Sequence, residues 1–153
     1  MKILFVCTGN TCRSVMAHQM LKKMLADKNL KEPQWEVRSC GVAVWTDMLI
    51  PPIVLEVLES HGIPRFHYRP TPIDQKLVDW ADLILVMTWG HLNGIQTNYP
   101  QAKQKTYRLK EFAGLEKPWD IPDPIAQDET IYRACLEEIQ KGLKGVWEKC
   151  IPN

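Results

Sequence analysis

Apolar and polar positions along the chain follow two alternating periodicities. Short apolar runs at residues 2–6 and 82–87 are typical of buried strands, and residues 35–39 alternate as a half-buried strand does. Residues 105–109 predict a fourth strand. Helical spacing or helix-start signals predict helices between and after these strands, at residues 14–28, 53–61, 74–81, 89–99 and 130–150.

This alternation of strand and helix predicts an α/β fold, a three-layer sandwich in which helices flank both faces of a parallel sheet. We find no repeat, linker or low-complexity tract, so we expect residues 1–153 to form a single domain. In such sheets the active site lies beyond the carboxyl ends of the strands. The first of these ends is at Cys7.

Composition and charge limit the classes of function that this chain is expected to have. Hydrophobic residues make up 45% and charged residues 24% of the 153 positions, and the net charge is +1, so we expect no nucleic-acid partner. No apolar run reaches the roughly 18 residues that cross a bilayer. We therefore expect a cytoplasmic protein without a membrane partner. The five cysteines lack metal-binding spacing, which predicts neither a metal site nor a secreted disulfide framework; they are Cys7, Cys12, Cys40, Cys135 and Cys150.

The loop after the first strand has a Cys-x5-Arg pattern. Its bare spacing is weak evidence, but it stands between a predicted strand and a predicted helix, where backbone N–H groups and the helix dipole attract an anion such as phosphate. Gly9 and Asn10 tolerate the positive φ angles of a curled loop, and Arg13 can hold two phosphoryl oxygens. The candidate phosphate-binding residues are Thr8, Gly9, Asn10, Thr11, Cys12 and Ser14, with Arg13.

Cys7 is the candidate nucleophile. The loop amides, the helix dipole and Arg13 favour its thiolate, and Ser14 can donate a hydrogen bond to the sulfur. The alternative is that Cys7 is a small buried hydrophobic residue, as free cysteines usually are. The surrounding Gly9, Asn10, Arg13 and Ser14 favour the nucleophile.

A group that leaves phosphorus needs a proton, and a carboxylic acid on a loop commonly supplies it. The loop at residues 119–128 offers Asp123, which precedes a proline and is therefore biased toward an extended conformation. Asp-Pro is also an ordinary turn dipeptide, and Asp120 or Asp128 could serve as helix caps. Asp123 is the candidate general acid.

VCTGNTCRS at positions 6–14, followed far downstream by Asp123-Pro124, resembles the low-molecular-weight protein tyrosine phosphatase family. The resemblance covers essentially the whole chain and includes SCG at 39–41, ESHGI at 59–63 and MT at 87–88. It implies a four-stranded parallel sheet of order 2-1-3-4 and a two-step mechanism without metal or cofactor. Cys7 would form a cysteinyl-phosphate, Arg13 and the loop amides would bind its oxygens, and Asp123 would protonate the leaving group and then activate water.

The resemblance has further implications and some departures. Cys12 occupies the position of a second cysteine that could form a reversible disulfide with Cys7 under peroxide. The family usually has proline and glutamate where this chain has Val15 and His18; we expect His18 at the surface. Trp45 could form one aromatic wall of the site, although a lone tryptophan is more often core or a loop anchor.

The implied partner is a phosphorylated protein, and a weak homodimer is left open. Phosphotyrosine is the first substrate expected. Thr11 resembles the bacterial protein arginine phosphatases, where its hydroxyl would orient the attacking water, so phosphoarginine is the alternative. Arsenate reduction is a remoter one, because residues 89–120 lack a relay cysteine, and a phosphoprotein-binding module is weaker still.

The other histidines have no metal-binding spacing and are expected at the surface or in loops. They are His61, His67 and His91. His67 with Arg69 could instead brace the phosphate loop.

Overall fold

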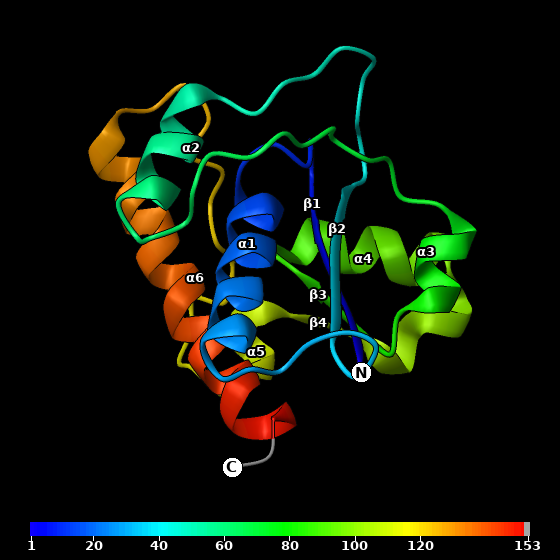
Figure 1. Cartoon of the computed structure of the whole chain (residues 1–153). Helices are drawn as coiled ribbons and strands as arrows, with labels where there is room; N and C mark the ends of the chain where they lie inside the picture. The colour runs from blue at the N-terminus through cyan, green and yellow to red at the C-terminus, as the bar shows by residue number, and fades with distance from the viewer. Residues whose placement is uncertain (152–153) are drawn as a thin grey trace.

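The computed structural model describes residues 1–151 and contains a four-stranded, fully parallel sheet between two layers of helices (Figure 1). The strands are β1 (Lys2–Cys7), β2 (Glu36–Gly41), β3 (Leu83–Val86) and β4 (Thr106–Arg108). They lie in the order β2-β1-β3-β4, which confirms the predicted sheet.

Helices cover both faces of this sheet. In Figure 1, α1, α2, α5 and α6 lie on one side of it, and α3 and α4 lie on the other. Their bounds, with a 3-10 helix labelled η1, are α1 (Arg13–Asp27), α2 (Pro52–Glu59), α3 (Gln75–Trp80), α4 (Trp89–Asn98), η1 (Pro100–Lys105), α5 (Leu109–Phe112) and α6 (Glu129–Cys150).

The central strand β1 explains why its sequence is continuously apolar. Ile3 and Phe5 are fully buried in the core formed with α1, α2 and α6, whereas Leu4 and Val6 are fully buried in the second core under α3 and α4. Successive side chains of a strand point to opposite faces, and both faces of β1 are covered. Cys7 continues the strand on the side of α1 and α6.

The fourth strand differs from its prediction. β4 is only three residues long, η1 precedes it, and Leu109 begins α5 instead of ending a strand. Leu109 is fully buried and packs closely against Gly142 of α6, where an added Cβ would lie 2.6 Å from the Leu109 Cγ. This contact between α5 and α6 could not be predicted from the local pattern of apolar and polar residues.

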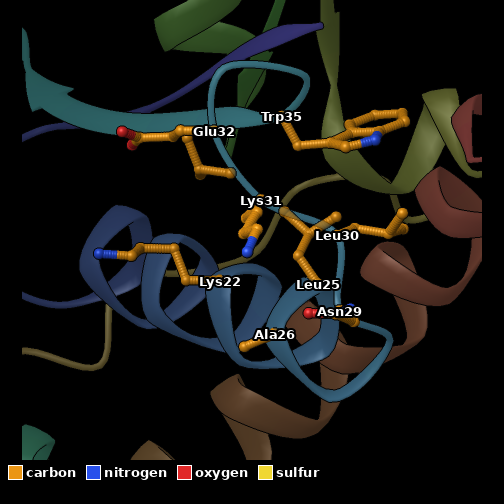
Figure 2. Close-up of a pocket in the computed structure, with 9 residues that line it drawn as sticks. Lys22, Leu25, Ala26, Asn29, Leu30, Lys31, Glu32 and Trp35 are labelled. Carbon is orange, nitrogen blue, oxygen red and sulfur yellow. The ribbon is translucent and has the colours of Figure 1, made fainter.

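A pocket of about 290 Å³ lies where α1 ends and the chain turns toward β2 (Figure 2). Figure 2 shows Leu25 and Ala26 on α1 and Trp35 across from them, with Leu30 between. Val37, which also lines it, neighbours Ile3 in the sheet, whereas Cys7 lies opposite Gly41 at the other end of the same two strands. None of the predicted site residues lines this pocket.

Within residues 1–151, no helix combines the length and the apolar character that crossing a membrane requires.

Candidate active site

The predicted nucleophile lies at the carboxyl end of the central strand. Cys7 is the last residue of β1, α1 begins at Arg13, and the loop between them curls above the amino end of that helix. The Cys7 side chain is almost fully buried, and its Sγ lies 2.9 Å from the Oγ of Ser14. The expected contact between serine and sulfur is therefore present.

Asn10 holds the loop in its curled form. Its φ is 54°, in the left-handed region where asparagine is favoured. Its amide Nδ2 donates to Ser14 Oγ at 2.8 Å, and its Oδ1 accepts from the Thr71 N–H at 2.8 Å and from the Tyr68 hydroxyl at 2.9 Å. The fully buried side chain thus joins the loop to the chain segment before α3.

Of the two loop residues expected to tolerate a positive φ, Asn10 adopts one and Gly9 does not, because glycines with positive φ in the described chain are Gly62 and Gly114. A Cβ at Gly9 would lie 2.8 Å from the Cε of Met48. This atom is the flexible end of the Met48 side chain, which can move aside, so the contact is only a weak steric reason for glycine.

Arg13 contacts both the loop and the segment that carries the candidate acid. Its Nη1 donates to the carbonyl of Ile121 at 2.9 Å, and its Nη2 lies 3.3 Å from Thr8 Oγ1 and 3.4 Å from Asp123 Oδ2. The guanidinium is almost fully buried, and its Nε has no partner among the described residues. A buried cation beside the loop amides can bind a phosphoryl group.

The loop that carries Asp123 is fastened to the sheet. The Ile121 N–H donates to the Met87 carbonyl at 2.8 Å, and Asp120 Oδ1 accepts from the Trp89 N–H at 2.8 Å and from Arg108 at 3.3 Å. These contacts hold the segment between β3 and the Cys7 loop. Asp123 keeps 38% of its side chain exposed, so its carboxylate can reach an incoming group.

His91 was predicted at the surface or in a loop, and that prediction was wrong, because the residue is buried in α4. The side chain is 6% exposed, and its Nε2 lies 2.9 Å from Thr8 Oγ1. Burial lowers the pKa of His91 to about 4, and the nearby positive charge of Arg13 acts in the same direction, against Asp120 and Asp123. The capping residue Thr88 could have signalled this placement, because it sets His91 in the first turn of α4 at the end of β3.

His18 was also expected at the surface, yet it is 8% exposed. Its Nδ1 lies 3.0 Å from Ser39 Oγ, and Ser39 Oγ lies 2.6 Å from the Tyr68 hydroxyl. The alternative that His67 and Arg69 brace the loop named the wrong residues, because both are exposed. Tyr68, which lies between them, donates a hydrogen bond to Asn10 of the loop instead. The extended segment before Thr71 carried no local signal of this role.

Thr11 and Cys12 are buried residues of the same loop. Thr11 is 6% exposed, with its Oγ1 3.7 Å from Cys12 Sγ. Cys12 is buried, and the hydroxyl of Tyr132 in α6 lies 4.0 Å from its sulfur. Burial raises the pKa of the Cys12 thiol. All five cysteines are free, so a disulfide between Cys7 and Cys12 stays a prediction.

Two further expectations concern the surroundings of the site. Trp45 lies in the loop after β2 with three quarters of its side chain exposed, so it is not core, and its role as an aromatic wall stays a prediction. Among residues 1–151, no three histidine, cysteine or acidic side chains are grouped as metal ligands would be.

Comparison with known proteins agrees with this geometry. The family model described as "Low molecular weight phosphotyrosine protein phosphatase" matches residues 2–151. A protein-arginine-phosphatase of Geobacillus stearothermophilus is 38% identical over 149 residues, which cover 97% of this chain and 95% of that protein. A probable low molecular weight protein-tyrosine-phosphatase, EpsP, of Ralstonia nicotianae is 35% identical over 92% of this chain and 90% of that protein.

A solved structure extends the comparison to three dimensions. The YwlE arginine phosphatase, in a C7S mutant with a phosphorylated active site serine, superposes with a TM-score of 0.87 at 31% identity, covering 99% of this chain and 98% of that one. The strand order, the loop after β1 and the match over residues 2–151 lead to one conclusion: the chain belongs to the low molecular weight phosphotyrosine protein phosphatase family.

Proposed function

We propose that this protein hydrolyses phosphoarginine in phosphorylated proteins through a phosphocysteine formed on Cys7. The observation that carries the phosphatase chemistry is the convergence of three groups on one loop. Cys7 supplies the sulfur, Arg13 the buried cation, and Asp123 a half-exposed carboxylate 3.4 Å from that cation. A nucleophile, an oxyanion-binding group and a proton donor are the parts that acyl or phosphoryl transfer requires.

In the first step, the phosphoryl oxygens bind the N–H groups of the Cys7 loop and the Arg13 guanidinium. The Cys7 sulfur attacks phosphorus, a bond between sulfur and phosphorus forms, and the bond between phosphorus and the side-chain nitrogen breaks. Protonated Asp123 gives its proton to that nitrogen. The product is a phosphocysteine and a free arginine side chain.

In the second step, the Asp123 carboxylate takes a proton from a water molecule, which attacks phosphorus. Inorganic phosphate leaves, and the bond between sulfur and phosphorus breaks to regenerate the thiolate. The Ser14 hydroxyl, 2.9 Å from the sulfur, stabilises the departing thiolate. The phosphorylated active-site serine in the related YwlE mutant supports a covalent intermediate of this kind.

Thr11 favours phosphoarginine among the possible substrates. Its side chain is short, it belongs to the nucleophile's own loop, and it is 6% exposed. The 38% identity to an arginine phosphatase, over nearly all of both chains, supports the same choice. Phosphotyrosine is the second candidate, because three exposed apolar side chains suit a phenyl ring. They are Trp45 in the loop after β2, Trp89 at the start of α4, and Ile125 in the loop that carries Asp123.

The proposal includes the cytoplasm as the protein's compartment. Five free thiols, four of them on buried residues, suit a reducing environment. A weak homodimer stays a prediction.

Parallel turnover of a phosphoarginine peptide and a phosphotyrosine peptide tests the proposal, with wild type, Cys7→Ser and Thr11→Ile. We expect wild type to prefer phosphoarginine, Thr11→Ile to shift the ratio of kcat/KM toward phosphotyrosine, and Cys7→Ser to abolish both activities. Turnover by Cys7→Ser would reject the nucleophile. If Thr11→Ile leaves the ratio of kcat/KM for the two peptides unchanged, Thr11 does not select between phosphoarginine and phosphotyrosine.

A further inference from the structure

A line of hydrogen-bonded side chains connects α1 to the sulfur of Cys7. It starts at His18, passes through Ser39 of β2 and Tyr68, and reaches Asn10 and then Ser14 in the loop. The successive separations are His18 Nδ1 to Ser39 Oγ 3.0 Å, Ser39 Oγ to Tyr68 Oη 2.6 Å, Tyr68 Oη to Asn10 Oδ1 2.9 Å, Asn10 Nδ2 to Ser14 Oγ 2.8 Å and Ser14 Oγ to Cys7 Sγ 2.9 Å.

The half of this line next to the nucleophile has a fixed direction. The amide nitrogen of Asn10 can only donate, so the Ser14 oxygen accepts. The hydroxyl hydrogen of Ser14 is then free to point at Cys7. A donated hydrogen bond stabilises a thiolate more than a thiol, because the acceptor is charged.

The direction of the other half follows from Asn10 Oδ1, which can only accept. The Tyr68 hydroxyl carries one hydrogen, and donating it to Asn10 leaves the Tyr68 oxygen to accept from Ser39. The backbone carbonyl of Ser39 competes for that hydrogen at 3.1 Å, slightly farther than Asn10. Once Ser39 donates to Tyr68, its oxygen must accept, and the donor within reach is His18 Nδ1.

We propose that His18 is a positioning residue for Cys7: its Nδ1–H orients the hydroxyls of Ser39 and Tyr68 so that Asn10 and Ser14 keep their donors directed at the sulfur. The proposal rests on Cys7 being the nucleophile of the function proposed above. It assigns a role to a residue that makes no contact with the loop itself. His18 acts only through its neighbours, so it is not a catalytic residue.

The surroundings of His18 keep its imidazole neutral near pH 7. Burial lowers its pKa to about 4, and the positive charge of Lys22 one turn along α1 acts in the same direction, while a hydrogen bond with the backbone of Val37 opposes them. The ring of Tyr68 packs edge-on, with centroids 6.0 Å apart. A neutral imidazole has a single N–H, for which the Val37 backbone and the Ser39 hydroxyl compete. The proposal places this hydrogen at Nδ1, directed at Ser39.

A carboxylate at position 18 would reverse the direction of the hydrogen bonds through Ser39 and Tyr68. It can only accept, so Ser39 would donate to it and Tyr68 would donate to Ser39, which removes one of the two hydrogen bonds on Asn10 Oδ1. His18→Glu therefore reverses the line while keeping a polar group there. His18→Leu removes the donor, and His18→Asn keeps an N–H donor near the place of Nδ1.

Two measurements on the purified full-length protein test the proposal. The first is the pH midpoint of Cys7 alkylation by iodoacetamide, followed by mass spectrometry of the Cys7 peptide, and the second is kcat and KM for p-nitrophenyl phosphate. We expect His18→Leu and His18→Glu to raise the midpoint and to lower kcat by about 3- to 10-fold, with little change in KM. His18→Asn should recover most of the lost kcat. Gln19→Ala, which changes the adjacent residue of α1 outside the line, serves as the matched control.

A double-mutant cycle separates positioning from packing. Tyr68→Phe cuts the line between His18 and Asn10, so adding His18→Leu to Tyr68→Phe should change neither the alkylation midpoint nor kcat further. The thermal unfolding midpoint should still fall, because the buried site is repacked. If His18→Leu does not fold, Ser39→Ala breaks the same line one bond further on and carries the same expectation.

Several results would overturn the proposal. One is that His18→Leu and His18→Asn lower kcat equally. Another is that the effects of His18→Leu and Tyr68→Phe on kcat add. A third is that His18→Leu lowers the unfolding midpoint but leaves the pH midpoint of Cys7 alkylation unchanged. Alkylation needs no turnover, so it separates this proposal from the function. An inactive wild type whose alkylation still responds to His18→Leu would reject the phosphatase while supporting the link from His18 to Cys7.

Discussion

Arg13 and Asp123 are joined in space although they lie in opposite halves of the chain. Arg13 Nη2 is 3.4 Å from Asp123 Oδ2, and Arg13 Nη1 donates to the carbonyl of Ile121 at 2.9 Å. One buried guanidinium thus contacts both the Cys7 loop and the segment that carries the candidate acid.

The Asp123 carboxyl is the first point to test. Asp123→Asn keeps the size of the side chain but cannot donate an acidic proton, so kcat should fall about 10²- to 10⁴-fold on a phosphoarginine or phosphotyrosine peptide. The fall should be smaller on p-nitrophenyl phosphate, because nitrophenolate leaves without protonation. Steady-state kinetics on the three substrates measure this difference.

Asp128→Asn is the control for that experiment. Asp128 caps α6 by accepting from the Ile131 N–H at 3.1 Å, and asparagine can do the same. Its activity should stay at the wild-type level. An equal loss for all three substrates in Asp123→Asn would contradict a role in protonating the leaving group.

Ser14→Ala removes the hydroxyl that faces the sulfur and leaves the Nδ2 of Asn10 without its acceptor. Hydrogen bonds to charged groups contribute roughly 1.5–3 kcal/mol, so kcat should fall about 10- to 100-fold. Pre-steady-state measurements should locate part of the loss in breakdown of the phosphocysteine, where the thiolate leaves. Unchanged rates of both steps would show that the serine is not needed.

Gly41 allows the Cys7 loop to approach β2. A Cβ at Gly41 would lie 2.5 Å from the Thr8 carbonyl oxygen and 2.8 Å from the Asn10 nitrogen, so Gly41→Ala must displace the loop backbone. We expect a destabilisation of about 1–3 kcal/mol together with a large loss of kcat/KM. Urea unfolding and turnover measure the two effects.

Gly94→Ala is the matched substitution in α4, where a Cβ has no neighbour within 4 Å. Alanine is favoured over glycine in a helix by up to about 1 kcal/mol, so this variant should be as stable as wild type or more stable, with normal activity. Equal behaviour of the two variants would contradict the packing argument at Gly41.

The two buried histidines predict a loss of stability in mild acid. The pKa values of His18 and His91 are lowered from 6.5 to about 4. Between these limits the unfolded chain binds a proton that the folded protein does not, so the free energy of unfolding falls as the pH falls from 6.5 toward 4. The slope contributed by each histidine is at most about 1.4 kcal/mol per pH unit.

His91→Gln should flatten this dependence, because its side chain does not titrate. Urea unfolding of wild type and variant at pH 7 and pH 5 gives the difference attributable to this histidine, since the carboxylates are common to both proteins. A parallel decrease in the two proteins would show that His91 is not buried in its neutral form.

The sequence by itself determined the order of elements and the candidate chemistry. Continuous apolar runs predicted β1 and β3 because both faces of these strands are covered by helices. The Cys-x5-Arg loop could be predicted from the sequence because its residues are close together in the chain, between a strand and a helix. Asp123 was recognisable from its proline neighbour and from the family resemblance. Each of these predictions rests on residues that are neighbours in the chain or on the pattern of the family.

Only the tertiary structure decided what surrounds that loop. His18, Tyr68 and His91 are polar residues whose environment depends on segments far away in the chain, so nothing beside them in the sequence distinguished a buried hydrogen-bonded role from an exposed one. Leu109 likewise follows a strand but begins a helix, because Gly142 of α6 gives it a place to pack. Periodicity records which side of an element is buried, whereas the partners of a buried polar group are fixed only when distant elements pack together.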